Sequence, residues 1–236
     1  MLNPVTETIS IIIPVLNEAH QLSKILHILQ QALDVEIIVI DGGSQDQTLE
    51  IAKRAGVKII QSPIGRAHQM NAGVADATGD ILLFLHADTR LPRDFDLTIR
   101  DTLSQSTVIA GAFRLKIDAP GWKLRVIEWG VNARSRYLQM PYGDQAIFLK
   151  TTTFQALGGF PNLPIMEDFE LVRQLKRQGR IAIASTAVIT SGRRWQKLGA
   201  VRTTLINQCV ILAYLLGVSP DRVAQWYRSG MKRLRK

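Results

Sequence analysis

The first half of the chain alternates short apolar runs with amphipathic stretches. Four runs are rich in apolar and β-branched residues and have the length of strands: 9–13, 35–40, 57–60 and 81–85. Pro14 is expected to end the first strand. Apolar residues recur at helical spacing between these runs, which predicts helices from residue 17, over 46–55 and over 65–77. The alternating order predicts a doubly wound parallel sheet with right-handed crossovers.

The second half of the chain is less regular. Its patterns predict strands at 108–115, 145–149 and 181–184, and helices at 122–137, 151–157 and 167–178. A further helix at 203–218 has an apolar core of only 209–218, whereas a membrane span needs about 20 apolar residues. We therefore expect an α/β fold with a Rossmann-like, mostly parallel sheet flanked by helices. The catalytic or binding domain would occupy 1–198, and 199–236 would form a helical C-terminal extension.

Charge narrows the class of partner. The 236 residues include 29 Lys and Arg against 20 Asp and Glu, and this net charge of +9 favours anionic partners. The last fifteen residues contain no acid and six cations, Arg222, Arg228, Lys232, Arg233, Arg235 and Lys236. No DNA- or RNA-binding signature accompanies them, so we expect no nucleic acid. A basic helix bearing Trp226 instead predicts peripheral membrane contact or a homodimer through 203–236.

The single cysteine and the first residues bear on the compartment. One cysteine excludes internal disulfides and fits a reducing compartment, and Cys209 is expected to be a packed thiol because it lies in an apolar run. No basic-then-apolar leader precedes the first strand. We expect a cytoplasmic protein, located at the inner face of the membrane if the extension binds lipid.

The run 81–85 ends abruptly in a polar segment. A parallel strand covered on both faces delivers the following residues to the carboxyl edge of the sheet, where open α/β proteins bind ligands. His86 and Asp88 are two residues apart and would share a face if the strand continued. They could hold a divalent cation or the phosphate and ribose of a nucleotide. The alternative of equal weight is a strand end at which Asp88 caps the next turn.

Two other loops could meet a nucleotide. The residues after the second strand, 41–46, combine Asp41, which would face the crevice, with glycines such as Gly43 that let the backbone approach a ligand. Arg66 opens the next helix and could pair with phosphate or stack on a base. For residues 41–46 the alternative is a tight turn with Asp46 as the N-cap of the next helix. For Arg66 the alternative is a solvated helix face.

The second half supplies acids and further cations. Glu167, Asp168 and Glu170 start a helix, and such crowding raises the pKa of a carboxylate toward a value useful for a general base. One or two of them could equally serve only the helix N-terminus. Asp144 is expected near an acceptor. Three residues late in the chain could meet a diphosphate or merely cover the surface: Arg193, Arg194 and Trp195.

Together these motifs resemble the family 2 glycosyltransferases, which have the GT-A fold. The match rests on six motifs in the expected order: 13–18 (IPVLNE), 41–46 (DGGSQD), 66–73 (RAHQMNAG), 86–88 (HAD), 158–160 (GGF) and 167–168 (ED). With the short length, 66–73 and 142–145 (YGDQ) resemble the subgroup called transferase 2 of radical-SAM and selenodomain neighbourhoods, which includes enzymes assigned to arsenosugar biosynthesis.

The resemblance implies inverting transfer of a sugar from a nucleotide-diphosphate donor, a UDP-sugar by expectation, to an acceptor hydroxyl. By similarity, Asp88 with His86 would bind Mn²⁺ or Mg²⁺, and Asp168 with Glu167 would supply the general base. Diphosphate or acceptor contacts would come from Arg193, Arg194, Trp195 and Asp144. The donor nucleotide pocket would comprise Pro14, Asn17, Glu18, Asp41, Gly43, Arg66, Asn71 and Ala87.

Two departures from the family pattern matter. His86 stands where the family's Asp-x-Asp motif has its first acid, and an imidazole leans toward manganese over magnesium. Residues 193–195 (RRW) lack the Gln that begins the Gln-x-x-Arg-Trp motif of processive synthases, which predicts transfer of a single sugar. The competing hypotheses are a nucleotidyltransferase and a non-catalytic nucleotide-sugar-binding or partner module.

Overall fold

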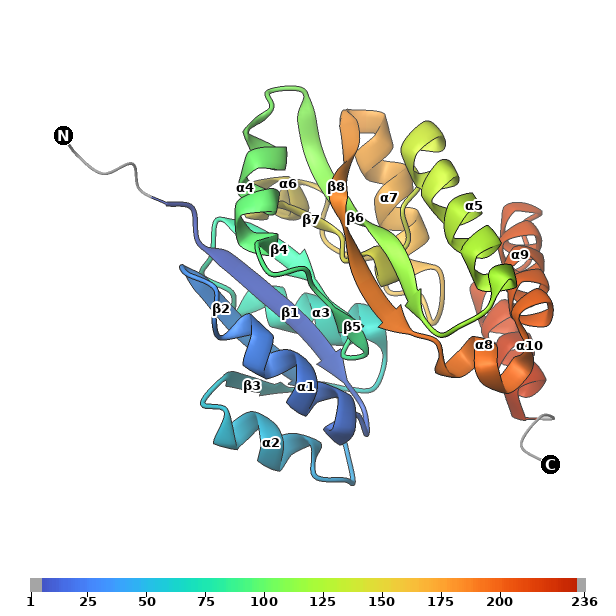
Figure 1. Cartoon of the computed structure of the whole chain (residues 1–236), viewed down its shortest axis with the longest axis horizontal. Helices are drawn as coiled ribbons and strands as arrows, with labels where there is room; N and C mark the ends of the chain where they lie inside the picture. Colours follow the sequence, from blue (N-terminus) through green and yellow to red (C-terminus); the bar gives the residue numbers. More distant parts are fainter. Residues whose placement is uncertain (1–5, 233–236) are drawn as a thin grey trace.

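The computed structural model describes residues 6–232, with side chains as far as Ser229. Within that range the strands are β1 (Ile9–Val15), β2 (Val35–Asp41), β3 (Lys58–Gln61), β4 (Ile81–Phe84), β5 (Thr89–Arg90), β6 (Val108–Asp118), β7 (Phe148–Lys150) and β8 (Arg180–Ser191). They form one sheet in the order β3-β2-β1-β4-β7-β6-β8-β5 (Figure 1). β7 and β5 pair antiparallel with their neighbours, and the other pairs are parallel. The prediction of a mostly parallel α/β sheet is confirmed.

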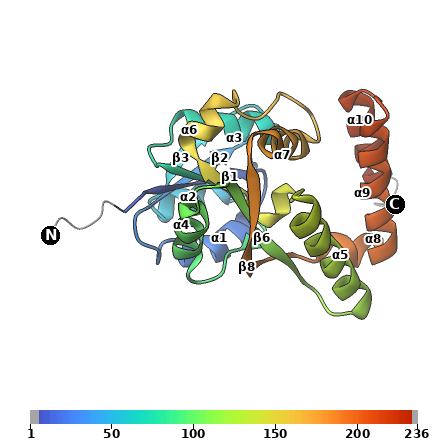
Figure 2. The same ribbon diagram turned by 90° about the horizontal axis from the view of Figure 1, so that it is seen from above.

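Helices cover both faces of this sheet. The bounds are α1 (Ala19–Leu29), α2 (Thr48–Arg54), α3 (Arg66–Ala75), α4 (Phe95–Ser104), α5 (Trp122–Leu138), α6 (Thr151–Ala156), α7 (Glu167–Gln178), α8 (Arg193–Leu198), α9 (Ala200–Leu215) and α10 (Pro220–Lys232). One apolar core lies between the sheet and α1, α2, α4 and α5, and the other between the sheet and α3, α6 and α7 (Figure 2). α8, α9 and α10 gather at one end.

The central strand runs through its proline. β1 continues to Val15, with Pro14 opposite Ile40 of β2, so the expectation that Pro14 ends the strand was wrong. The carbonyl of Ile12 accepts a hydrogen bond from the Leu85 N–H, which follows β4. Successive residues of a strand bond to opposite sides, so the backbone of Pro14, two residues on, faces the same side as Ile12. β4 pairs with β1 only as far as Ile12, so the ladder on this side ends where proline offers no N–H.

The second half departs furthest from the sequence-based expectations. α4 and α8 were not predicted, and the strand expected at 145–149 is replaced by a 3₁₀ turn over Gly143–Gln145 followed by β7. β8 runs to Ser191 rather than 184, because it pairs along nearly all of β6 although its middle is polar and exposed. Cys209 is exposed on α9, not packed, because the inward face of that helix is made by other residues.

α9 and α10 are joined to the rest of the fold by a small third core. Ile165, Met166 and Phe169 pack there against Val223 and Ala224. Among residues 6–232, no helix has both the length and the apolar character needed to cross a membrane. Arg233, Arg235 and Lys236 of the basic tail lie outside the described residues.

Candidate active site

The carboxyl ends of β1, β2 and β4 meet at one edge of the sheet. They bring together the loops that begin at Leu16, Gly42 and Leu85, and Arg66 at the start of α3 lies beside them. After β4 the backbone turns, since the N–H of Thr89 bonds the carbonyl of His86. The strand therefore does not continue through His86 and Asp88, but both side chains still reach the site.

Two adjoining cavities occupy this edge and share Arg66, His86 and Asp88. The first, about 360 Å³, is lined on its remaining sides by Pro14, Val15, Leu16, Glu18, Ile64, Gly65, Gln69, Ala87, Pro164 and Arg228. The second, about 240 Å³, has a mixed lining of polar side chains, which include Asp144, Asp168 and Arg194, and apolar ones. Residues from both halves of the chain thus surround one continuous site.

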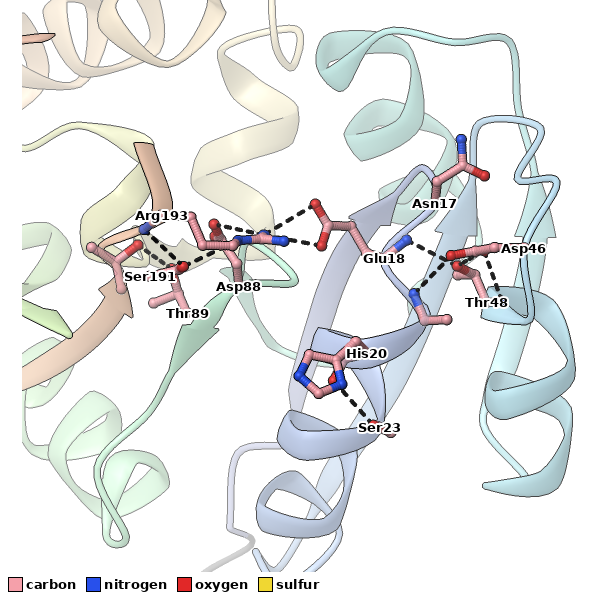
Figure 3. A network of polar contacts seen from close by, with 12 residues as sticks. Asn17, Glu18, His20, Ser23, Asp46, Thr48, Asp88, Thr89, Ser191 and Arg193 are labelled. Atoms are coloured by element: carbon pink, nitrogen blue, oxygen red, sulfur yellow. Dashed lines mark hydrogen bonds and ion pairs between the residues drawn. The ribbon is translucent and has the colours of Figure 1, made fainter. Parts of the chain in front are cut away.

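One arginine links two carboxylates at the mouth of the first cavity. The Arg193 guanidinium lies 3.2 Å from Glu18 Oε2 and 3.4 Å from Asp88 Oδ2 (Figure 3). All three side chains are partly exposed, so the contact is water-screened and easily exchanged for a stronger one. An anionic ligand that enters here would meet a cation already held in place.

A second arginine is held by a buried acid. Arg66 Nε bonds Glu167 Oε1 at 2.8 Å, and the Glu167 side chain is 2% exposed. Burial raises the pKa of Glu167, while the Arg66 charge opposes that rise. Glu167 therefore holds Arg66 in place between the two cavities. Of the two adjacent acids, Asp168 is the one that lines the second cavity.

Asp168 and His86 converge over a glycine. Asp168 Oδ2 accepts a 2.7 Å hydrogen bond from the Gly143 N–H. A Cβ at position 143 would lie 3.0 Å from that oxygen and 3.1 Å from His86 Nε2, so the two groups meet across Gly143. Burial and then the Arg66 charge lower the pKa of His86 to about 4, which keeps its imidazole neutral at neutral pH.

Asp144 is the most perturbed carboxyl of the site. Burial, with a further contribution from Asp168, raises its pKa to about 6, although Arg134 opposes the rise. Its Oδ1 has no hydrogen-bond partner within the described residues, and neither have Arg194 Nε and Trp195 Nε1. All three side chains line the second cavity, where a ligand could satisfy these atoms.

Four residues predicted in the donor pocket do not line the cavities. Asn71 clamps the backbone of Phe160 through two hydrogen bonds of 2.8 and 2.9 Å. Asp41 is 1% exposed and accepts bonds from the N–H groups of Gly43 and Ser44. Asn17 Oδ1 accepts a 2.8 Å bond from Gln45, which ties the loops after β1 and β2 together. These residues shape the loops rather than the cavity surface.

Sequence reasoning missed the apolar wall of the second cavity. Tyr142 and Phe169 face it from the central domain, and α9 and α10 add Val210, Ile211 and Tyr227. The apolar residues of α9 recur at helical spacing, which indicated only a packed helix. The sequence therefore could not distinguish residues that line a cavity from residues of the core. Gln69 was also left out of the site. Its amide bonds the carbonyls of Val15 and Ile40, joining the ends of β1 and β2.

The family of the chain follows from comparison with known proteins. The model of glycosyl transferase family 2 matches residues 10–158, which is more than half of the chain and includes the loops described above. The chain belongs to glycosyl transferase family 2. It is therefore a glycosyltransferase, and the alternatives of a nucleotidyltransferase and a non-catalytic module are set aside.

Two relatives in the family show how far the similarity extends. A PGL/p-HBAD biosynthesis glycosyltransferase of Mycobacterium bovis is 28% identical over 80% of this chain and 91% of its own length. A 4,4'-diaponeurosporenoate glycosyltransferase of Staphylococcus haemolyticus is 38% identical, but over 39% of this chain and only 27% of its own length.

Solved structures of similar shape confirm the GT-A fold. TarS of S. aureus, residues 1–349 in complex with UDP-GlcNAc, matches with a TM-score of 0.62 and 18% identity over 78% of this chain and 58% of its own. The mannosyltransferase PcManGT of Pyrobaculum calidifontis, in complex with GDP-Man and Mn²⁺, matches with a TM-score of 0.62 and 21% identity over 79% and 57%. The chain thus spans less than two thirds of either structure.

The raised pKa of Asp144 predicts a pH-dependent cost in stability. In the folded protein this carboxyl holds its proton up to about pH 6, whereas in the unfolded chain it releases it near 3.8. The folded state binds more protons within that window, so stability falls as pH rises from about 4 to 6. Asp144→Asn lacks this fall and should gain up to about 3 kcal/mol over the wild type between pH 4 and pH 7.

Urea unfolding of both proteins at pH 4 and pH 7 measures the difference. Asp101→Asn, at an exposed position on α4, is the matched control and should follow the wild type at both values. Parallel pH dependence of Asp144→Asn and the wild type would show that Asp144 is ionised in the folded protein like an ordinary carboxyl.

Proposed function

We propose that the protein transfers a single sugar, with inversion, from a nucleotide-diphosphate donor to an acceptor hydroxyl, and that the donor is a UDP-sugar. The observation that carries this proposal is the pair of cavities joined at Arg66, His86 and Asp88, with Asp168 on the far side of the junction. Inversion requires the base and the leaving group on opposite sides of the anomeric carbon. Two separate cavities with a shared charged boundary suit that arrangement.

The first cavity is the proposed donor site. Pro14 and Ala87 supply apolar surface for a base and ribose, and Glu18 supplies a carboxylate for hydroxyl or N–H donors. Arg193 already stands between Glu18 and Asp88, and exchange of these contacts for a diphosphate would give a charge-assisted bond. TarS and PcManGT were solved with UDP-GlcNAc and GDP-Man, which supports a nucleotide-sugar in this cavity. Of these two nucleotides, UDP is the one that we propose.

The side chains at the junction of the cavities could supply only part of the ligand set of a divalent ion. No group of three or more His, Cys, Asp or Glu side chains within the described part of the chain could hold a metal unaided. Asp88 offers one carboxylate at the junction, and neutral His86 offers an imidazole, so donor phosphates would have to complete the ligand set. We propose Mn²⁺ or Mg²⁺ held by Asp88, with His86 as second candidate. Such an ion would neutralise charge on the departing diphosphate.

Asp168 is the proposed general base. It lines the second cavity, and its Oδ2 is oriented by the Gly143 N–H. Glu167, the other predicted catalytic acid, is assigned the role of holding Arg66 in position. Arg194, Trp195 and Asp144 have unpartnered polar atoms facing the same cavity and are proposed to contact the acceptor or the transferred sugar.

The proposed acceptor carries an apolar part next to its hydroxyl. Ile165, Val210 and Ile211 supply apolar lining of the second cavity. Burial of apolar ligand surface against them would contribute about 25 cal/mol per Å². The two relatives named above act in the biosynthesis of PGL/p-HBAD and on 4,4'-diaponeurosporenoate, which supports acceptors of differing structure in this family.

The remaining expectations are also proposals. We propose a domain at 1–198 with an extension at 199–236 that completes the site, because Arg228 and Tyr227 of α10 reach the cavities. We propose membership of the transferase 2 subgroup on the motifs at 66–73 and 142–145. A cytoplasmic location at the inner face of a membrane, with contact through 203–236, is proposed on the charge of the extension.

Replacement of the base tests the reaction. Asp168→Asn keeps the size of the side chain and an acceptor oxygen for the Gly143 N–H, but it cannot take a proton. We expect turnover of UDP-sugar to fall by about 10²–10⁴, with UDP affinity within about twofold of the wild type. Initial-rate kinetics and UDP titration by calorimetry measure the two quantities.

Asp101→Asn serves as the matched control, since it removes an exposed carboxylate outside both cavities. Full turnover by Asp168→Asn would show that Asp168 is not the general base. A large loss of UDP affinity would instead place Asp168 in the donor site.

Asp88 should couple metal to nucleotide. In a thermal-shift measurement, Mn²⁺ added with UDP should raise Tm above UDP alone, because a ligand of the folded state stabilises it. Asp88→Asn should lose the increment due to Mn²⁺ and keep most of the increment due to UDP. An undiminished Mn²⁺ increment in this variant would exclude Asp88 as the metal ligand, and the same loss in His86→Asn would identify a second ligand.

A further inference from the structure

The outward face of α5 is an exposed aromatic stripe. Trp122, Val126, Trp129 and Tyr137 are spaced to share one side of the helix, and they are 72%, 57%, 74% and 79% exposed. The opposite side of α5 packs on the sheet through buried Leu124 and its neighbours. A contiguous apolar stripe of this kind on a monomer marks an interaction site.

A second apolar stripe lies on the adjacent helix α9. Val201, Leu205, Leu212 and Leu215 recur at helical spacing and are 55–59% exposed. α5 contacts α9, and both lie at the same end of the molecule (Figures 1 and 2). The two stripes together, called here the α5–α9 surface, are not covered by any other element within the described residues.

A groove of about 740 Å³ beside α5 is lined with arginines. Between α5 and β8 it is lined by Trp129 and Tyr137 and by four guanidinium groups, those of Arg114, Arg125, Arg136 and Arg180. Its only carboxylate, Glu128, pairs with Arg125 at 3.0 Å and bonds the Ile117 N–H. No ion pair within the described residues engages the other three arginines.

The charge around the α5–α9 surface is mainly positive. α9 contains Arg202 and no acid, and α5 contains four cations against one acid, Glu128. An anionic partner is therefore favoured from both edges of the surface. A second copy of the chain is disfavoured, because a twofold contact would bring the same arginines face to face.

We propose that the α5–α9 surface docks on an anionic phospholipid bilayer. Tryptophan and tyrosine favour the boundary between lipid and water, where aliphatic side chains reach the acyl region. Arginine forks bind phosphate oxygens of headgroups, which assigns the groove beside Trp129 to lipid headgroups. This surface involves α5, in addition to the extension at 203–236, and the inference stands without the proposed sugar transfer.

Docking would place the second cavity near the lipid. Val210 and Ile211 line that cavity from one side of α9, while Leu205 and Leu212 occupy its exposed side. A single helix thus separates the proposed acceptor site from the proposed membrane surface. An apolar acceptor held in the bilayer would be close to the site that glycosylates it.

Vesicle sedimentation of the full chain tests the proposal. The wild type should bind vesicles of phosphatidylglycerol and phosphatidylcholine and should bind pure phosphatidylcholine at least about tenfold more weakly. Two double variants, Trp122→Ser with Trp129→Ser and Arg136→Glu with Arg180→Glu, should each weaken binding to the anionic vesicles at least about tenfold. The control, Leu33→Ser with Lys53→Glu, changes an exposed leucine and lysine elsewhere and should bind like the wild type.

Three results would overturn the proposal: no binding of the wild type to anionic vesicles, wild-type binding by both double variants, or a dimer in light scattering that Trp129→Ser dissociates. Retained binding by the variants with loss on deletion of 222–236 would assign lipid contact to the basic tail instead. The UDP-induced rise in Tm, measured on every variant, shows that the fold and donor site are intact. It also separates failure of docking from failure of the proposed sugar transfer.

Discussion

The ion pair between Arg66 and Glu167 joins the two halves of the site. Arg66 begins α3, beside the nucleotide-facing loops, and Glu167 begins α7 in the second half of the chain. Arg66 is 47% exposed and Glu167 is 2% exposed, so loss of Arg66 would leave a buried carboxyl without its partner, whereas loss of Glu167 would leave a half-exposed arginine. The pair therefore fixes α7 relative to α3. It also explains two adjacent acids, since successive helix residues point about 100° apart and Asp168 is turned to the second cavity.

Arginines and carboxylates of the protein already pair with one another in the site before any ligand enters. Arg193 contacts Glu18 and Asp88, and Arg66 contacts Glu167, so each arginine at the junction already faces carboxylate. The Arg66 pair is buried on its acid side and will persist, whereas the Arg193 contacts are long and exposed. A diphosphate would thus recruit Arg193 at little cost and meet Arg66 in a fixed position.

The sequence foretold the elements better than the roles of side chains. Apolar runs placed β1, β2 and β4 and hence the loops at their carboxyl ends, because burial on both faces leaves a strong pattern. Asn71 does not line either cavity, and the sequence could not show this because a polar side chain on a helix gives the same signal whether it faces a cavity or clamps the backbone of Phe160. β8 was cut short because its polar middle hides a long pairing with β6 that only the tertiary structure reveals.

The helical extension changes how the limits of the catalytic unit should be drawn. Arg228 reaches the first cavity, and Tyr227 and Val210 reach the second, although all three follow residue 198. The family match ends at 158, before Asp168 and before every residue of the apolar wall except Tyr142. The loops proposed to face the nucleotide lie inside the matched part, and the residues proposed to face the acceptor lie mostly outside it. We therefore propose that acceptor choice depends mainly on residues beyond 158.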